Sequence, residues 1–142
     1  MMEHADNSER MVQLLDEGKQ VQLTPVGSSM LPFIRGEVDS VVLRKPESLR
    51  VGDIALAPYQ GRYVLHRIIR IEGDTVVMMG DGIVEGTEKV GKSAVLAIVT
   101  EIVKANGRHR KPTRGRLWRL LLPVRRYLLK GMRKWNQLFG KQ

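Results

Sequence analysis

Short stretches in which hydrophobic residues dominate or alternate with polar ones follow one another between residues 21 and 103. Turn-forming residues separate them, and Gly73-Asp74 supplies the two-residue connection typical of a β-hairpin. The pattern predicts strands over residues 21–23, 38–43, 53–57, 62–71, 75–79 and 95–103. Short strands at this close spacing favour a small, mostly antiparallel β domain.

The two ends of the chain have the periodicity of helices. Residues 7–18 have one apolar face and end at a glycine, which predicts a short helix. Residues 116–139 have a broader apolar stripe, and Pro123 should kink or break the helix that carries it. We expect apolar contacts from Leu117, Trp118, Leu121, Val124, Leu128, Met132, Trp135 and Phe139, with the cations Arg119, Arg126, Lys130 and Arg133 beside or opposite them.

Positive charge is concentrated at the C-terminal end. The chain has 24 Lys and Arg, 15 Asp and Glu and a net charge of +9, but residues 104–142 hold 13 of these cations and no acidic residue. An apolar stripe beside a Lys/Arg face is typical of a helix that lies in a membrane interface, where anionic lipid attracts it. Packing against the protein's own β domain or a partner protein is the alternative. Nucleic acid also attracts cations, but the apolar face would have no use there.

The composition restricts cofactors and compartments. The chain has no cysteine, which excludes disulfides and thiolate zinc sites, and His4, His66 and His109 lack metal-ligand spacing, so we expect no metal and no cofactor. The first ten residues lack the basic start and apolar stretch of an export signal, and no run of about 18 apolar residues could span a bilayer. We therefore expect a peripheral protein on the cytoplasmic side of a membrane.

Four parts follow from these patterns. A helical lead-in is expected over residues 1–20, a β domain over 21–104, a basic linker over 105–115 and a basic amphipathic helix over 116–142.

A serine and a histidine are the candidate reactive groups. Ser29 lies in a tight turn over residues 27–32 that is bounded by Gly, Ser and Pro, and His66 lies in an otherwise apolar stretch over residues 64–68. Serine is a poor nucleophile until a neighbouring base takes its proton, and histidine is the usual base. Taken singly, the turn reads as a solvated loop and the histidine as a structural residue, so the hypothesis depends on the fold bringing the two together.

Four sequence boxes occur in the order found in a known group of peptidases. Ser29-Met30-Leu31-Pro32 resembles the Ser-Met-x-Pro nucleophile box of signal peptidase I and of LexA-type self-cleaving repressors. Val51-Gly52-Asp53-Ile54-Ala55-Leu56 resembles the Gly-Asp-Ile-hydrophobic strand that follows this box. His66-Arg67-Ile68 and Met79-Gly80-Asp81-Gly82 resemble the His-Arg-Ile and Gly-Asp boxes of the endoplasmic-reticulum, archaeal and spore-former type of signal peptidase. The resemblance covers about residues 21–103; in its last strand Ala97 stands where glycine is usual.

The resemblance implies a fold and a set of roles. The fold is a small, bent antiparallel β barrel or sheet, with Ser29 as nucleophile and His66 as general base. Asp81 would orient the imidazole, and the Ser29 backbone with the Ser28 side chain would bind the oxyanion. The usual Asn-Asn and later Asp are missing after Gly82, so Asp74 and Glu85 stay open as alternatives to Asp81. Arg67 should point to the opposite face of its strand and be structural or exposed.

The favoured function is a serine endopeptidase of signal-peptidase type that cleaves a leader or signal-like peptide while peripherally bound to a membrane. Its substrate would bind as an extended strand, with small side chains near the cleaved bond. A lysine base is disfavoured because no lysine occurs between Lys45 and Lys89. One alternative is a LexA-type self-cleaving regulator, but 20 residues are too short for a helix-turn-helix domain and no Ala-Gly or Cys-Gly pair precedes Ser29. The other is an inactive adaptor, in which Ser29 and His66 need not meet.

Overall fold

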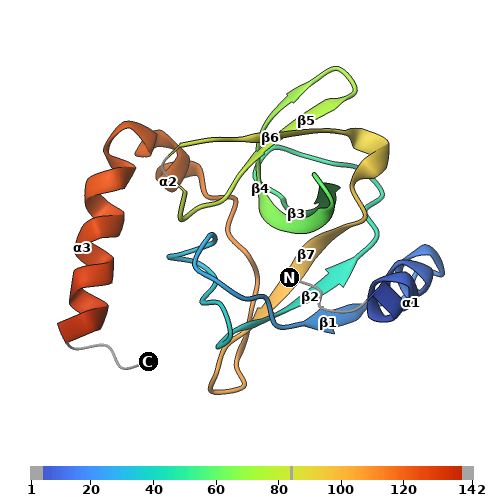
Figure 1. Cartoon of the computed structure of the whole chain (residues 1–142), viewed down its shortest axis with the longest axis horizontal. Coiled ribbons are helices and arrows are strands. Elements are labelled where there is room, and N and C mark those ends of the chain that lie inside the picture. Colours follow the sequence, from blue (N-terminus) through green and yellow to red (C-terminus); the bar gives the residue numbers. More distant parts are fainter. Residues whose placement is uncertain (1–4, 84, 139–142) are drawn as a thin grey trace.

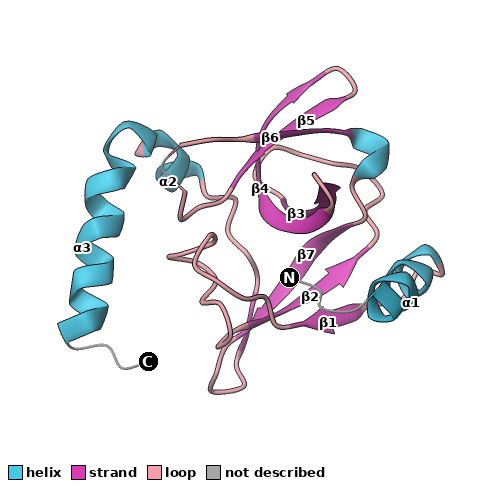
Figure 2. Ribbon diagram, in the orientation of Figure 1, coloured by secondary structure: helices cyan, strands magenta, loops and turns pink. Residues whose placement is uncertain are grey.

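The computed structural model describes residues 5–83 and 85–138, which form one antiparallel sheet with short helices outside it (Figure 1, Figure 2). The strands are β1 (Val21–Leu23), β2 (Ser40–Arg44), β3 (Ile54–Tyr59), β4 (Arg62–Glu72), β5 (Thr75–Met79), β6 (Glu88–Gly91), β7 (Ala97–Val103) and β8 (His109–Arg110). The helices are α1 (Ala5–Asp16), the 3₁₀ turn η1 (Lys92–Ala94), α2 (Arg116–Leu120), the 3₁₀ turn η2 (Leu122–Val124) and α3 (Arg125–Leu138).

The strands pair in the order β1-β2-β7-β3-β4-β5-β6, and β8 adds to β7. All of these pairings are antiparallel. The chain is therefore mostly β, as the sequence predicts. The sheet is curled around β3 and β4 (Figure 1), but among the described residues it stays open, with β1 and β6 at the ends of the path, so it is not a closed barrel.

Strand β4 pairs with two neighbours in succession, which leaves part of one edge open. Its first half, from Arg62 to Arg67, pairs with β3, whereas β5 pairs only from Arg67 onward. The β3–β4 turn has two residues with positive φ, as in the tight hairpins that match strand twist. Counting from this turn, the backbone groups of Tyr63 and Leu65 point away from β3. In the described part of the chain no strand covers them.

Two apolar clusters occupy the two faces of the curled sheet. In β3, Ile54 and Leu56 belong to one cluster, and Ala55 and Ala57 belong to the other. The first cluster also contains Met11 and Leu15 of α1 and Met30 of the loop after β1. Helix α1 is thus part of the β domain's core, and each such buried side chain contributes roughly 1.5–3 kcal/mol.

The six predicted strands and the N-terminal helix are confirmed within a few residues at each end. Strands β6 and β8 were not predicted, because β6 has a single large apolar residue, Val90, and β8 lies within the basic linker. The predicted break at Pro123 is also confirmed, since the turn η2 separates α2 from α3. Among the described residues, no helix is both long enough and apolar enough to cross a bilayer.

The C-terminal helices lie at the end of the molecule opposite α1 (Figure 1), and they pack partly on the β domain. Trp118 is only 7% exposed, and Arg125 and Leu129 are buried. The prediction that Trp118 faces a membrane is therefore wrong, because its ring packs edge-on against Phe33 with 6.2 Å between ring centroids.

The other predicted contact residues of this segment fall into three groups. Leu117, Val124, Leu128, Arg126 and Lys130 are exposed, and Leu121, Met132 and Arg119 are half-buried. Phe139 lies outside the described residues, as do the side chains of Trp135 and Arg133.

Candidate active site

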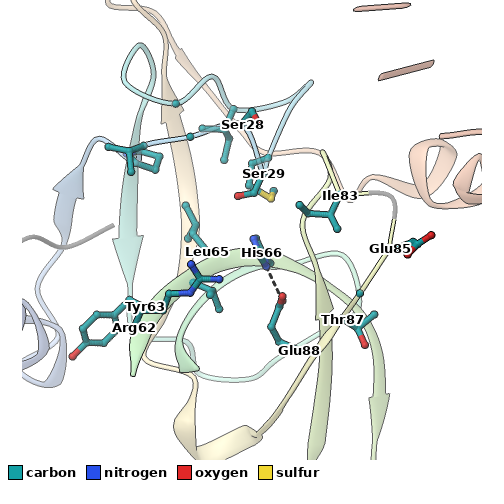
Figure 3. A pocket seen from close by; sticks show the side chains of 18 residues that line it. Ser28, Ser29, Arg62, Tyr63, Leu65, His66, Ile83, Glu85, Thr87 and Glu88 are labelled. Carbon is teal, nitrogen blue, oxygen red and sulfur yellow. Dashed lines mark hydrogen bonds and ion pairs between the residues drawn. The ribbon is translucent and has the colours of Figure 1, made fainter. Parts of the chain in front are cut away.

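Ser29 and His66 line the same groove, although 36 residues separate them along the chain (Figure 3). The groove has a volume of about 420 Å³, within the usual range for ligand sites. Its walls are the loop over residues 25–30, the open-edged half of β4, and Ile83 together with residues 85–88, which lead into β6. The polypeptide therefore brings the predicted nucleophile and base to one concave surface.

The loop that carries Ser29 is fixed on both sides. Buried Met30 anchors it in the apolar core, and the N–H of Ile34 donates to the Met30 carbonyl at 3.0 Å. The Ser29 carbonyl accepts a hydrogen bond from the N–H of Gly82 at 2.7 Å. By contrast, the Ser29 N–H has no hydrogen-bond partner among the described residues, so it is available to an oxyanion. Ser28 also lines the groove and is exposed.

Two glycines let the turn after β5 approach this loop. A Cβ at Gly80 would lie 2.4 Å from the Ser29 carbonyl oxygen and 3.0 Å from Cδ2 of His66. A Cβ at Gly82 would lie 2.3 Å from the Ser28 carbonyl oxygen. Side chains at these positions would push the nucleophile loop away from the histidine. The Gly-Asp-Gly sequence is therefore a packing requirement of the candidate site.

The imidazole of His66 is held by a carboxylate that the sequence did not single out. Its Nδ1 lies 2.6 Å from Oε1 of Glu88, the first residue of β6, and both side chains are largely buried. Because an ionised carboxylate can only accept, Nδ1 carries the proton and donates it. Figure 3 shows the other ring nitrogen pointing toward Ser29. This arrangement selects the tautomer in which Nε2 can act as a base.

The hydroxyl of Ser29 and the His66 ring are not hydrogen-bonded to each other in this structure. Catalytic hydrogen bonds are often long in enzymes without substrate and tighten as the reaction complex forms. The two groups lie on facing walls of one groove, the serine on the loop over residues 25–30 and the histidine on β4. Proton transfer requires the serine hydroxyl to come within hydrogen-bond distance of Nε2.

The expectation that Asp81 orients His66 is wrong. Both carboxylate oxygens of Asp81 bond instead to Arg67, at 2.6 Å to Nη2 and 3.2 Å to Nε, and both residues are almost fully buried. The reason is strand alternation, which puts Arg67 on the opposite face of β4 from His66. The other two candidates do not hold the imidazole either: Asp74 is exposed in the β4–β5 turn, and Glu85, although it lines the groove, is exposed and pairs with Arg126 at 3.1 Å.

Arg67 joins the β domain to the C-terminal segment. Besides Asp81 it donates to the carbonyls of Gly52 and Thr113, and its guanidinium lies 5.2 Å from the centre of the Phe33 ring. The expectation of an opposite-facing, structural Arg67 agrees with these contacts, which bury the side chain completely. One guanidinium thus connects the Asp81 carboxylate to the linker backbone at Thr113.

The C-terminal helices brace the turn that packs against Ser29. Trp118 donates its indole N–H to the Asp81 carbonyl at 2.8 Å. Arg125 reaches the carbonyls of Gly80 and Ile83, both at 3.3 Å, and its guanidinium lies over the Trp118 ring. Burial lowers the pKa of Arg125, with Asp81 opposing this effect, but an arginine keeps its charge. The amphipathic pattern of the tail could not reveal these contacts, because lipid and protein interiors select the same residues.

No group of three or more His, Asp or Glu side chains among the described residues is placed to hold a metal ion. No protein-family model and no curated protein matches this chain.

Proposed function

We propose that the chain is a serine endopeptidase of signal-peptidase type, with Ser29 as nucleophile, His66 as general base and Glu88 as the residue that orients the base. The observation that carries the proposal is the shared groove, in which Ser29 and His66 face each other and Glu88 fixes the far side of the imidazole at 2.6 Å. Along the chain, the loop that carries Ser29 precedes the strand that carries His66, and the two belong to one curled antiparallel sheet domain. This arrangement supports the fold of LexA and signal peptidase that the sequence boxes imply.

The reaction uses these groups in sequence. Ser29 Oγ attacks the carbonyl carbon of the scissile peptide bond while Nε2 of His66 removes its proton. Glu88 stabilises the resulting imidazolium through Nδ1–H, as the acid of other serine hydrolases does. The Ser29 N–H, aided by the Ser28 hydroxyl, donates to the oxyanion, and such a donor contributes about 3–4 kcal/mol.

The second half of the reaction releases the products. The imidazolium gives its proton to the departing amine, the C–N bond breaks, and the N-terminal part of the substrate stays attached to Ser29 as an ester. Water then attacks the ester while His66 takes its proton, and the serine leaves with that proton. The net reaction consumes one water and yields a carboxylate and an amine.

The open edge of β4 offers a place for the substrate backbone. Tyr63 and Leu65 direct their backbone groups toward the groove, immediately before His66. An extended peptide that pairs with this edge would run past His66 toward Ser29 as an added strand. A leader or signal-like peptide suits the site because it can be extended where it is cut. The resemblance further implies small side chains beside the scissile bond.

Two observations favour the peptidase over the alternatives. Met11 and Leu15 bury α1 in the core of the β domain, so the described residues before β1, 5–20, are part of that domain rather than a DNA-binding unit of their own. An adaptor has no need to place a serine, an oriented histidine and a carboxylate around one groove.

Cleavage of a panel of leader-like peptides, followed by mass spectrometry, tests the proposal. We expect the wild-type chain and Ser28→Ala to cut at one defined bond, with Ser28→Ala slower by about 10²-fold or less. Ser29→Ala should produce no cut at that bond. Cleavage that persists in Ser29→Ala would show that another group, or a contaminant, carries the activity.

A further inference from the structure

The exposed apolar residues of the structure are concentrated on the C-terminal helices. Five of the eight large hydrophobic residues that are exposed in the described part of the chain lie between 117 and 128. Leu117, Leu120 and Tyr127 are 70%, 78% and 72% exposed, and Val124 is 44% exposed. We call these four residues, which lie on α2, η2 and the start of α3, the α2 surface. Scattered exposed leucines are ordinary, but a cluster of them marks a contact surface.

The α2 surface adjoins an apolar hollow of about 500 Å³. Phe33, Leu117, Trp118 and Leu121 line it, together with residues 113–116. Arg116 is one of the lining residues and is exposed. These features match the chemistry of an anionic lipid. The exposed leucines and the apolar hollow suit its acyl chains, and the guanidinium of Arg116 suits its charged headgroup.

The charged side chains of the C-terminal helices are all cationic, since the sequence has no acidic residue after Glu101. Arg116, Lys130 and Lys134 are exposed, and Arg126 is exposed and pairs with Glu85 of the β domain. A second copy of the chain would bring the same cations to the same place and be repelled. Nucleic acid would satisfy the cations but leave Leu117 and Leu120 without an apolar partner. An anionic bilayer satisfies both groups.

The other side of the segment is fixed to the protein. Trp118 and Arg125 are bonded to the turn over residues 80–83, and Leu129 is buried. The α2 surface is therefore held in one orientation at the end of the molecule opposite α1 (Figure 1). It differs from the stripe that the helical periodicity predicts, because Leu120 and Tyr127 belong to it and Trp118 does not.

We propose that the α2 surface docks on an anionic membrane, with Leu117 and Leu120 inserted among the acyl chains and Arg116, Lys130 and Lys134 at the headgroups. The docking is independent of the proposed peptidase activity. It brings the catalytic groove to the membrane surface through the same segment that braces the Gly80–Gly82 turn.

Co-sedimentation of the full chain with phosphatidylcholine vesicles, with and without phosphatidylglycerol, tests the proposal. We expect binding only to the anionic vesicles, and release at high salt. Leu117→Ser/Leu120→Ser should weaken binding at least about tenfold, whereas the matched control Val38→Ser, at an exposed valine elsewhere, should not. Lys130→Gln/Lys134→Gln should weaken it about fivefold per charge, more than the same charge change in Lys19→Gln/Lys92→Gln.

Other results would overturn the docking. These are equal binding to neutral and anionic vesicles, no binding to either, or full binding by the double leucine variant. Self-association or DNA binding that the leucine variant abolishes, without vesicle binding, would assign the surface to another occupant. Ser29→Ala should bind vesicles like wild type, so a failed peptidase proposal and a failed docking proposal give different results.

Discussion

Glu88 accepts a hydrogen bond from Nδ1 of His66 at 2.6 Å, and this contact joins the first residue of β6 to the middle of β4. Most of the His66 ring is buried between this carboxylate and the loop of Ser29. The ring therefore has one nitrogen held by the protein and one directed to Ser29.

Replacing Glu88 by glutamine should lower kcat/KM strongly while the chain stays folded. The amide keeps the size of the side chain but removes the charge that stabilises the imidazolium and selects its tautomer. In a serine protease the comparable change costs about 10⁴-fold. Peptide cleavage measures the effect, and Glu72→Gln, an exposed carboxylate at the end of β4, is the matched control. Normal activity in Glu88→Gln would remove Glu88 from the mechanism.

Asp81→Asn should act mainly on stability. It leaves the fully buried Arg67 without its ionised partner, and such a loss typically costs about 3–5 kcal/mol. Urea unfolding measures the change, with Glu72→Gln as a control that breaks an exposed pair and costs less than about 1 kcal/mol. An unchanged free energy of unfolding for Asp81→Asn, together with lost activity, would return Asp81 to the catalytic set.

Trp118→Phe tests whether the C-terminal helices position the nucleophile. The change keeps a ring against Phe33 but removes the N–H that bonds to the Asp81 carbonyl at 2.8 Å. We expect a loss of about 1 kcal/mol of stability and a lower kcat with little change in KM, because the groove itself is not touched. If kcat is the same in Trp118→Phe and in the exposed-site control Leu120→Ala, the bracing has no catalytic role.

The lowered pKa of the Asp39 carboxyl predicts how the stability of the protein depends on pH. Burial raises the pKa of its carboxyl, but hydrogen bonds from Arg35 and Lys104 outweigh burial, so the pKa is lower than usual. A group with a lowered folded-state pKa stabilises the protein at pH values above its unfolded pKa of about 3.9, and this stabilisation is lost as pH falls through the folded-state value. Urea unfolding between pH 7 and pH 3 should show a steeper acid loss for wild type than for Asp39→Asn. Parallel curves would contradict the ion-pair assignment.

The sequence was sufficient for the parts of the fold that rest on apolar alternation. Strands β4 and β5 are rich in apolar residues, several of them β-branched, and their hairpin connection is short, so their bounds were predictable. Strand β6 was not, because Glu88, Lys89 and Gly91 leave only Val90 to bury. For the same reason, the sequence did not identify Glu88 as a partner of His66.

The partner of a catalytic histidine depends on which face of a strand each residue occupies. Asp81 belongs to one of the motif boxes, but the turn after Met79 directs its carboxylate to Arg67. Glu88 reaches His66 because β6 returns beside β5. The sequence pattern does not show that β6 returns beside β5, so it could not predict this contact. Likewise, the periodicity of the tail identified an apolar stripe but could not separate Trp118, which is buried against the β domain, from Leu117, which is exposed.

The most direct test of the account is a double-mutant comparison of Ser29 and His66 in the cleavage of one peptide at a defined bond. If the two residues act as one unit, Ser29→Ala and His66→Ala each lower kcat/KM by about 10⁴-fold or more, and the double variant is no slower than either. The contrary result is a double variant whose loss equals the product of the two single losses. Independent effects of that kind would mean that the histidine does not activate the serine.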